Sequence, residues 1–459
     1  MAPEDLFAGD ATDATPLIWL VESEFEAWAA QQSEARRRWL AVQRIKPSYR
    51  APVWLPPDTA HEHPSVLLIA KQDESFETLA RAVEALPEGC FELTGDLPDL
   101  QAGHLGWALG GYVFDRYTRA AAPKARLKAS ASKDFARVMR IARAIWLARD
   151  LINTPASDLL PSHLSEIAEE TAKHTGAEFR VTVGDALLSA GFGAIHAVGR
   201  ASADPPRLID ITWGNLDHPK VTLVGKGVCF DSGGLDIKSA EGMKLMKKDM
   251  GGAAIALALA RLIIEQALPV RLRLLLPTVE NAISGNAFRP GDILKTYKGT
   301  TVEIGNTDAE GRLILADALA LGAEESPDLM LDFATLTGAA RIALGVALPA
   351  MFANSKALAD GILAEGESVG DPVWQLPLHA PYKWQIKSKV ADLNNAGYGP
   401  FNGAIYAALF LQEFVGESID WAHFDLMAWN TRKRPGHPVG GDCPSLHAVY
   451  SYLEQEFGR

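Results

Sequence analysis

The sequence has few cysteines, no surplus of positive charge and no long apolar run, and each absence excludes a class of protein. Only 3 cysteines occur among 459 residues, so neither a disulfide framework nor a cysteine-based zinc site is expected. The 57 acidic residues outnumber the 44 basic ones, and the net charge of −13 argues against nucleic acid or anionic membranes as partners. No apolar stretch could span a bilayer, and the N-terminal residues lack a signal-peptide pattern. We therefore expect a cytoplasmic protein.

Common catalytic motifs are missing as well. The sequence contains neither a G-x-S-x-G nucleophile elbow nor a G-x-x-x-x-G-K-[ST] phosphate loop. The segment VGKGVCF has a G-x-G without the third glycine of a dinucleotide-binding loop. No two of the 11 histidines are four residues apart, which excludes an H-E-x-x-H zinc site.

What is present predicts an α/β fold, because apolar strand-like segments alternate with helical patterns. Strands are expected at 16–21, 65–70, 208–214, 220–227, 271–277, 329–336 and 420–427. Helices are expected at 76–87, 134–152, 251–266, 311–325, 403–415 and 444–457. Strands that are apolar on both faces and separated by helices indicate a mostly parallel central sheet flanked by helices.

The arrangement of these segments along the sequence suggests two domains. Residues 1–125 predict a small N-terminal α/β domain, and 126–152 predict a linker followed by a connecting helix. The linker is expected because residues 120–133 are small, polar and basic. Residues 153–459 would then form the larger C-terminal catalytic domain, which carries the mostly parallel sheet.

Charged residues gather at what we predict to be strand ends. Lys226 and Asp231 follow an apolar strand into a loop with paired glycines, where α/β sheets bind ligands. Lys238 and Asp249 come before the next helix. Asp308, Glu310 and Arg312 alternate just before another helix, and an extended backbone would point all three side chains to one side.

Four carboxylates at one sheet edge repel each other unless cations lie among them. Two divalent cations would balance the charges of Asp231, Asp249, Asp308 and Glu310, and oxygen ligands suit Mg, Mn or catalytic Zn. The alternative is an exposed loop with ordinary salt bridges, which would be the better explanation for any one of these residues but not for the set.

These segments together resemble the leucyl (cytosol) aminopeptidase family of two-metal exopeptidases. The resemblance rests on NTDAEGRL (306–313), VGKGVCFDSGGLDIK (224–238), MKKDMGGAA (246–254) and LDFATLTGA (331–339). It extends over 284–313 without a break, and it implies an aminopeptidase acting on peptides with a free N-terminus, assembled as a homohexamer.

The resemblance also implies roles for individual residues. Asp231 and Glu310 would bridge two metal ions, Mn or Zn; Asp308 would complete one site, and Lys226 with Asp249 the other. Lys226 would bind as a neutral amine with a depressed pKa. Lys238 would stabilise the oxyanion, and Arg312 would hold a bicarbonate ion that accepts a proton from water.

The pocket for the N-terminal side chain is expected at Met246, Thr335, Gly338 and Met427, with backbone groups near Leu336 holding the peptide. The family commonly has a small residue where this chain has Met427, which makes a leucine preference less secure. Two alternatives stay open on the same scaffold. One is a narrow dipeptidase or Cys-Gly peptide hydrolase, and the other is a noncatalytic assembly or regulatory protein.

Overall fold

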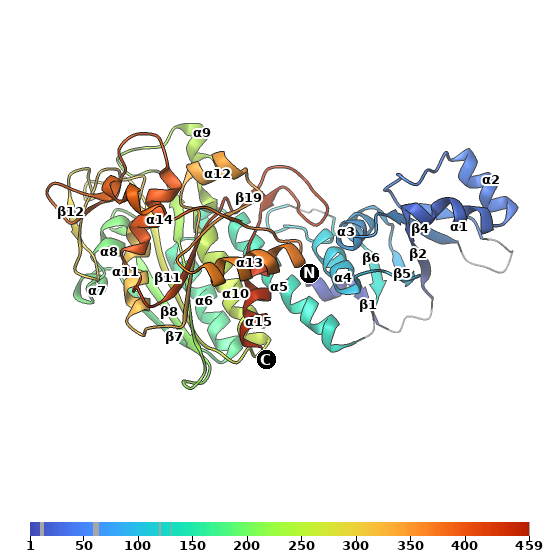
Figure 1. Cartoon of the computed structure of the whole chain (residues 1–459), viewed down its shortest axis with the longest axis horizontal. Helices are drawn as coiled ribbons and strands as arrows, with labels where there is room; N and C mark the ends of the chain where they lie inside the picture. The colour runs from blue at the N-terminus through green and yellow to red at the C-terminus, as the bar shows by residue number, and fades with distance from the viewer. Residues whose placement is uncertain (10–12, 58–63, 119–120, 130, 459) are drawn as a thin grey trace. The chain divides into compact units, whose positions relative to one another are not determined.

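The computed structural model describes residues 1–9, 13–57, 64–118, 121–129 and 131–458, which form two compact units (Figure 1). The smaller unit consists of Met1–Trp146 with Arg432–Val439, and the larger consists of Leu147–Thr431 with Gly440–Arg459. Within the described residues, none of the helices is both long and apolar enough to cross a membrane.

The smaller unit is built on a six-stranded sheet in the order β1-β6-β5-β2-β4-β3. The strands are β1 (Phe7–Ala8), β2 (Thr15–Val21), β3 (Val53–Leu55), β4 (Ser65–Ala70), β5 (Gly89–Thr94) and β6 (Ala125–Lys128). All neighbours are parallel except β3 and β4. Its helices are α1 (Phe25–Gln31), α2 (Glu34–Val42), α3 (Ser75–Ala85) and α4 (Leu100–Gly110). Every residue of β4 is buried, which explains its unbroken apolar sequence.

One expectation for this region is wrong. The segment 120–133 was expected to be an irregular linker, but its residues 125–128 form β6 and pair with both β1 and β5. Small and basic side chains are compatible with this strand because Arg126 is exposed while Ala125 and Leu127 are buried. The predicted helix that follows is confirmed as α5 (Lys133–Asn153). The domain bounds 1–125, 126–152 and 153–459 stay a prediction.

The larger unit contains a nine-stranded sheet with a parallel centre. Its order is β16 (Trp374–Gln375), β15 (Ala350–Ala353), β18 (Asp420–Asp425), β14 (Leu329–Ala334), β9 (Lys220–Gly225), β11 (Arg271–Asn281), β8 (Arg207–Trp213) and β7 (Glu178–Val183), with β10 (Gly227–Asp231) pairing β11. The strands β18, β14, β9 and β11 run parallel to one another, whereas β15, β8 and β7 pair antiparallel. The predicted mostly parallel sheet is confirmed.

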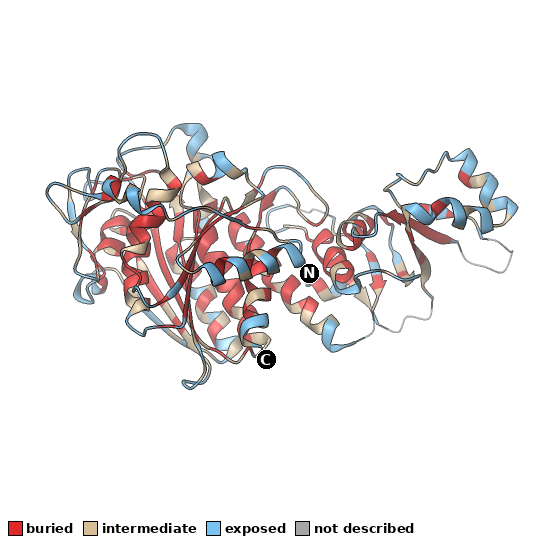
Figure 2. Cartoon of the chain, in the orientation of Figure 1, coloured by how far each residue is buried: buried red, intermediate tan, exposed pale blue. Residues whose placement is uncertain are grey.

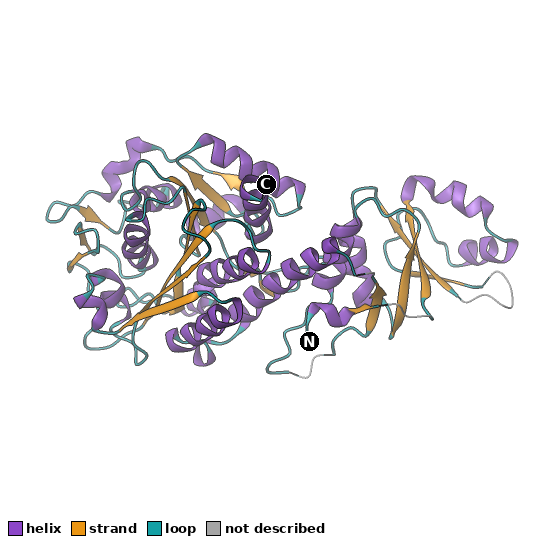
Figure 3. Ribbon diagram, turned by 90° about the horizontal axis from the view of Figure 1, so that it is seen from below, coloured by secondary structure: helices purple, strands orange, loops and turns teal. Residues whose placement is uncertain are grey.

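Helices cover both faces of this sheet (Figure 3). The helices are α6 (Pro161–Thr175), α7 (Ala186–Ser189), α8 (Gly193–Gly199), α9 (Ala240–Met243), α10 (Gly251–Glu265), α11 (Gly311–Ala323), α12 (Gly338–Leu344), α13 (Lys356–Ser368), α14 (Gly403–Gln412) and α15 (Leu446–Phe457). Helix α10 packs with α6 and α15 while α11 packs with α8 and α14, and the sheet between them is buried (Figure 2). The helices and strands predicted for this region are confirmed, with shifts of a few residues at their ends.

Helix α10 approaches the sheet unusually closely at Gly252. A Cβ atom at this position would lie 2.0 Å from the backbone oxygen of Phe333 in β14, so only glycine fits. The close approach brings the N-terminal end of α10, and the residues just before it, against the carboxyl ends of β9 and β14. These strand ends carry the candidate site.

Candidate metal centre

The predicted charged residues meet at the carboxyl ends of the parallel strands. Lys226 follows β9 directly, and Asp231 is the last residue of β10. Asp249 lies in the short 3-10 helix η4 (Met246–Met250) just before α10, and Glu310 is the N-cap of α11. Gly233 and Gly234 both have positive φ angles, which allows the chain to turn sharply after Asp231.

Three of the four carboxylates form one tight group. Oxygen atoms of Asp231, Asp308 and Glu310 all lie within 4.8 Å of one another. Asp249 joins the group through Lys226, whose Nζ is 2.8 Å from an oxygen of Asp249 and 2.9 Å from one of Glu310. All of these side chains are buried except Asp308, which is half-buried. The structure therefore brings Lys226 and the four predicted carboxylates together.

Two lysines neutralise much of this acid. Lys238 places its Nζ 2.7 Å from Asp231 and also forms an ion pair with Asp308. Burial disfavours the Lys226 ammonium, but attraction to Asp249, Glu310 and Asp231 outweighs it and raises the pKa of Lys226 above its ordinary value. This direction is opposite to the depressed pKa expected for a metal-bound Lys226, because here the lysine itself provides the positive charge.

The carboxylates nevertheless remain undercompensated. Burial and repulsion by Asp231 raise the pKa of Glu310 to about 8, and the same two causes raise the pKa of Asp308 to about 6. Oε2 of Glu310 is buried and has no hydrogen-bond partner. A buried carboxylate oxygen without a donor is costly, and a cation at this point would remove that cost. The donor set therefore fits divalent metal ions.

The backbone that carries Asp308, Glu310 and Arg312 differs from the expected extended segment. Residues 307 and 308 form a turn, and Arg312 already belongs to α11. The turn and the first helical residues, rather than a period of two, determine where these side chains lie. The Arg312 guanidinium packs over the Tyr406 ring at 5.1 Å and donates from Nη1 to the backbone oxygen of Asn395 at 2.7 Å. Its Nε is buried without a partner.

Two asparagines that we did not predict from the sequence support the cluster. Asn281, the last residue of β11, donates from Nδ2 to Asp231 Oδ1 at 2.8 Å and to the backbone oxygen of Thr307 at 3.1 Å. Asn395 follows β17 (Leu393–Asn394); its Oδ1 accepts from the backbone of Gly305 at 2.8 Å, and its Nδ2 donates to that of Asn306 at 2.7 Å. Asn281 could have been found as a polar residue ending an apolar strand.

A further set of bonds fastens the two acidic loops to each other. The backbone nitrogen of Thr307 donates to Asp236 at 2.7 Å, and that of Asp236 donates to the hydroxyl of Thr307 at 2.8 Å. The same hydroxyl donates to the backbone oxygen of Gly233 at 2.7 Å. The loop after β10 and the turn before α11 therefore form one rigid unit around Asp231 and Asp308.

The predicted pocket residues lie around the same strand ends. Thr335 follows β14; its hydroxyl donates to Asp249 Oδ1 at 2.7 Å, and its backbone oxygen accepts from Lys226 at 3.0 Å. The backbone nitrogen of Leu336 donates to Asp425 at 3.1 Å, so it is already engaged within the protein. Gly338 begins α12, and Met427 follows β18, the neighbour of β14. Met246 begins η4, which also carries Asp249.

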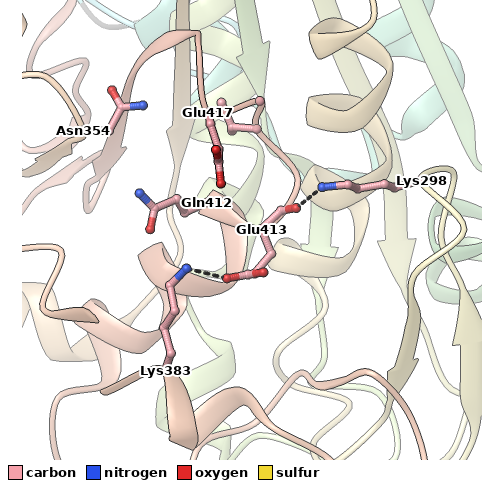
Figure 4. A pocket seen from close by; sticks show the side chains of 8 residues that line it. Lys298, Asn354, Lys383, Gln412, Glu413 and Glu417 are labelled. Atoms are coloured by element: carbon pink, nitrogen blue, oxygen red, sulfur yellow. Dashed lines mark hydrogen bonds and ion pairs between the residues drawn. The ribbon is translucent and has the colours of Figure 1, made fainter. Parts of the chain in front are cut away.

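A separate cleft of about 320 Å³ lies at the surface of the larger unit (Figure 4). Its lining consists of Lys298, Asn354, Lys383, Gln412, Glu413, Val415, Gly416 and Glu417. Lys383 is paired with the Glu413 carboxylate at 2.6 Å, and Lys298 donates to the backbone oxygen of Glu413 at 2.5 Å. The lining contains none of the predicted site residues. The ammonium groups of both lysines in it are already engaged by Glu413.

Comparison with known proteins shows similarity over both units of the chain. The profile of the cytosol aminopeptidase family, catalytic domain, matches residues 146–443, and that of the M17 aminopeptidase N-terminal domain matches 15–129. A probable cytosol aminopeptidase from Geobacter sp. (strain M21) is 41% identical over 369 residues, which is 77% of this chain and 74% of the relative.

Solved structures are similar over nearly the whole chain. The crystal structure of cytosol aminopeptidase from Coxiella burnetii has a TM-score of 0.94 and 44% identity, covering 99% of this chain and 100% of that one. The bottromycin maturation enzyme BotP in complex with Mn has a TM-score of 0.85 and 32% identity, with 96% and 99% covered.

Proposed function

The chain belongs to the cytosol aminopeptidase family, and we propose that its acidic cluster is the two-metal centre with which it removes N-terminal residues from peptides. The expectation of a metal-dependent aminopeptidase, a hydrolase, is thereby confirmed at the level of the family. The observation that carries the proposal for the site is the group of Asp231, Asp308 and Glu310 oxygens within 4.8 Å. Every charged residue expected of an active member is present, which disfavours a noncatalytic role.

The proposed ligands are Lys226, Asp231, Asp249, Asp308 and Glu310, holding two divalent ions per subunit, Mn or Zn. Asp231 and Glu310 are suited to contact both ions. Asp231 lies next to Asp308, and Glu310 forms an ion pair with the same lysine, Lys226, as Asp249 does. The unpartnered Oε2 of Glu310 supports this assignment. The Mn bound by the similar enzyme BotP is a property of that protein and suggests the first metal to test here.

Bound divalent ions supply Lewis acidity: they activate water at neutral pH and attract the free amine of a substrate. Lys238 is the proposed electrophilic group, because its ammonium remains next to the cluster and can stabilise negative charge on the carbonyl oxygen of the scissile bond. Arg312 is proposed to hold a bicarbonate ion, an anion suited to act as a general base. Its buried, unpartnered Nε supports the presence of an anion.

The proposed pocket for the N-terminal side chain consists of Met246, Thr335, Leu336, Gly338 and Met427. Thr335 links this pocket to the cluster through its bonds to Asp249 and Lys226. We also propose a homohexameric enzyme in the cytoplasm, acting on peptides with a free N-terminus and binding neither nucleic acid nor membranes. A panel of substrates that varies both length and second residue would distinguish a general aminopeptidase from a dipeptidase or Cys-Gly hydrolase.

The test of the site compares wild type with Arg312→Ala and Lys238→Ala after metal reconstitution. We expect both variants to keep their metal content, measured by elemental analysis, while kcat for amino-acid amides falls at least about a hundredfold. Added bicarbonate should partly restore Arg312→Ala but not Lys238→Ala. Wild-type turnover in Arg312→Ala would contradict its proposed role.

A further inference from the structure

Lys248 brings a further positive charge to the cluster beside Lys226 and Lys238, and the proposed ligand set does not use it. Its side chain is only 6% exposed. Its one ion pair among the described residues is with Asp249 Oδ1, at the long distance of 3.7 Å. The same oxygen accepts the hydroxyl hydrogen of Thr335 at 2.7 Å. Both groups contact one carboxylate oxygen, so the Lys248 ammonium lies near Thr335, a residue of the proposed pocket.

Arg341 brings another cation to the same region from helix α12. Its Nη1 donates to Met427 Sδ at 3.3 Å. A Cβ atom placed on Gly338 would lie 3.6 Å from Nη2. The guanidinium therefore extends over two of the residues proposed to form the pocket, and the thioether of Met427 helps to hold it there.

The charge of these two cations is hardly compensated. Among the described residues, Arg341 forms no ion pair, since its described polar contact is the Met427 sulfur. The carboxylate next to Lys248 belongs to Asp249, which the proposed metal ion also requires. Asp425, the acidic residue at the end of β18, is buried and already accepts hydrogen bonds from the backbones of Leu336 and Thr337. Within the described part of the chain, the two carboxylates beside these cations, those of Asp249 and Asp425, are thus already engaged.

Resting on the proposed function, we propose that the pocket selects peptides whose N-terminal residue is aspartate or glutamate. The substrate carboxylate would pair with Lys248 at the base of the pocket and with Arg341 at its rim. A buried ammonium gains more from an anion than an exposed one does, because little water competes for it. A leucine or methionine side chain would instead have to desolvate both cations without a compensating contact.

The experiment uses fluorogenic aminoacyl-coumarin amides with the full chain loaded with Mn or Zn. The substrates form isosteric pairs, Asp with Asn and Glu with Gln, together with Leu and Met. We expect kcat/KM for Asp over Asn, and for Glu over Gln, to be at least about tenfold. The isosteric pairs differ in charge alone, so this ratio is insensitive to the size of the pocket.

Three variants show whether these residues cause the preference. Lys248→Met and Arg341→Leu should each lower the Asp/Asn ratio about three- to tenfold, with the larger loss expected in KM. Arg341→Glu should invert the charge at the rim of the pocket. It should therefore lower kcat/KM for Asp and Glu substrates and raise kcat/KM for Lys and Arg substrates. Lys356→Met is the matched control, since its side chain is 86% exposed on α13 and pairs with Asp360. It should keep the wild-type ratio.

The outcomes are distinguishable. Hydrolysis of no amide after metal restoration would overturn the proposed function and this inference with it. Hydrolysis with an Asp/Asn ratio near one, unchanged in Lys248→Met and Arg341→Leu, would overturn the acidic preference and leave the aminopeptidase intact. An acidic preference that Lys356→Met also removes would overturn the assignment to Lys248 and Arg341. Circular dichroism and metal content check that each variant is folded.

Discussion

Asn281 shows how one uncharged residue can orient a buried carboxylate. Its amide donates both to Asp231 and to the backbone of Thr307, so it joins the end of β11 to both acidic loops. We expect Asn281→Ala to lower metal affinity about ten- to a hundredfold, because an outer partner that orients a ligand typically contributes that much. Chelator competition would measure the change. Asn215→Ala, in an exposed turn, is the control and should bind metal normally.

His104 makes the stability of the smaller unit depend on pH. It is buried on α4 against the edges of the Phe7 and Phe135 rings, and burial lowers its pKa from 6.5 to about 4. Between these two values the unfolded chain binds a proton that the folded chain does not. Stability is therefore complete above pH 6.5 and declines as the pH falls toward 4, by up to about 3 kcal/mol.

His104→Phe would keep the aromatic packing and remove the titrating group. The difference in apparent Tm between this variant and wild type should widen in favour of the variant as the pH falls from neutral. An NMR titration gives the pKa directly. A difference in Tm that stays constant with pH, or a His104 pKa at its ordinary value, would contradict this account.

Residue-level prediction from the sequence succeeded where chemistry is local and failed where it is not. Asp231 and Glu310 were recognisable because carboxylates beside glycines at strand ends are unusual. Asn395 was not, since its side chain bonds to Gly305, 90 residues away. An asparagine in a polar segment carries no sign of such a distant partner. The engaged backbone nitrogen of Leu336 was unpredictable for the same reason.

At the scale of helices and strands, the close contact between α10 and β14 allows only glycine at position 252. A Cβ atom there would come 2.0 Å from the backbone oxygen of Phe333. We expect Gly252→Ala to lower Tm by several degrees and to reduce metal binding, because the helix must move away from the strand ends. Gly285→Ala is the control, since a Cβ there meets nothing within 4 Å. Equal melting temperatures in both variants would contradict this.

Most helices and strands were predictable because apolar periodicity reflects burial directly. Sequence patterns predict secondary structure poorly where one residue type occurs in two structural contexts. Proline interrupts a helix interior, but it is favoured at the first helical position, and Pro161 is the first residue of α6. The segment around β6 has the composition of a linker yet pairs on both sides, because its alternating burial spans only four residues. Such a short pattern is hard to distinguish from chance.

At the scale of the whole molecule, all five proposed metal ligands belong to the larger unit. Ions that bind only the folded state stabilise it, by about 2.7 kcal/mol at a hundredfold excess over Kd. We expect chelation to abolish activity and to lower the melting temperature of the larger unit, with Mn or Zn restoring both. Calorimetry would follow the transitions, and Glu310→Gln should show a smaller metal-dependent shift. A melting temperature that stays the same when metal is removed and restored would contradict the proposed ligand set.

The bonds of Asn395 to the turn before α11 also matter during synthesis. The acidic side chains of that turn leave the ribosome well before residue 395, and β18, which pairs with β14, is made later still. A growing chain thus contains the proposed metal-ligating side chains long before Asn395 and β18, which hold their loops in place. We expect the enzyme to become active only after β18 (Asp420–Asp425) has been synthesised, so a nascent copy that lacks this strand should not hydrolyse peptides.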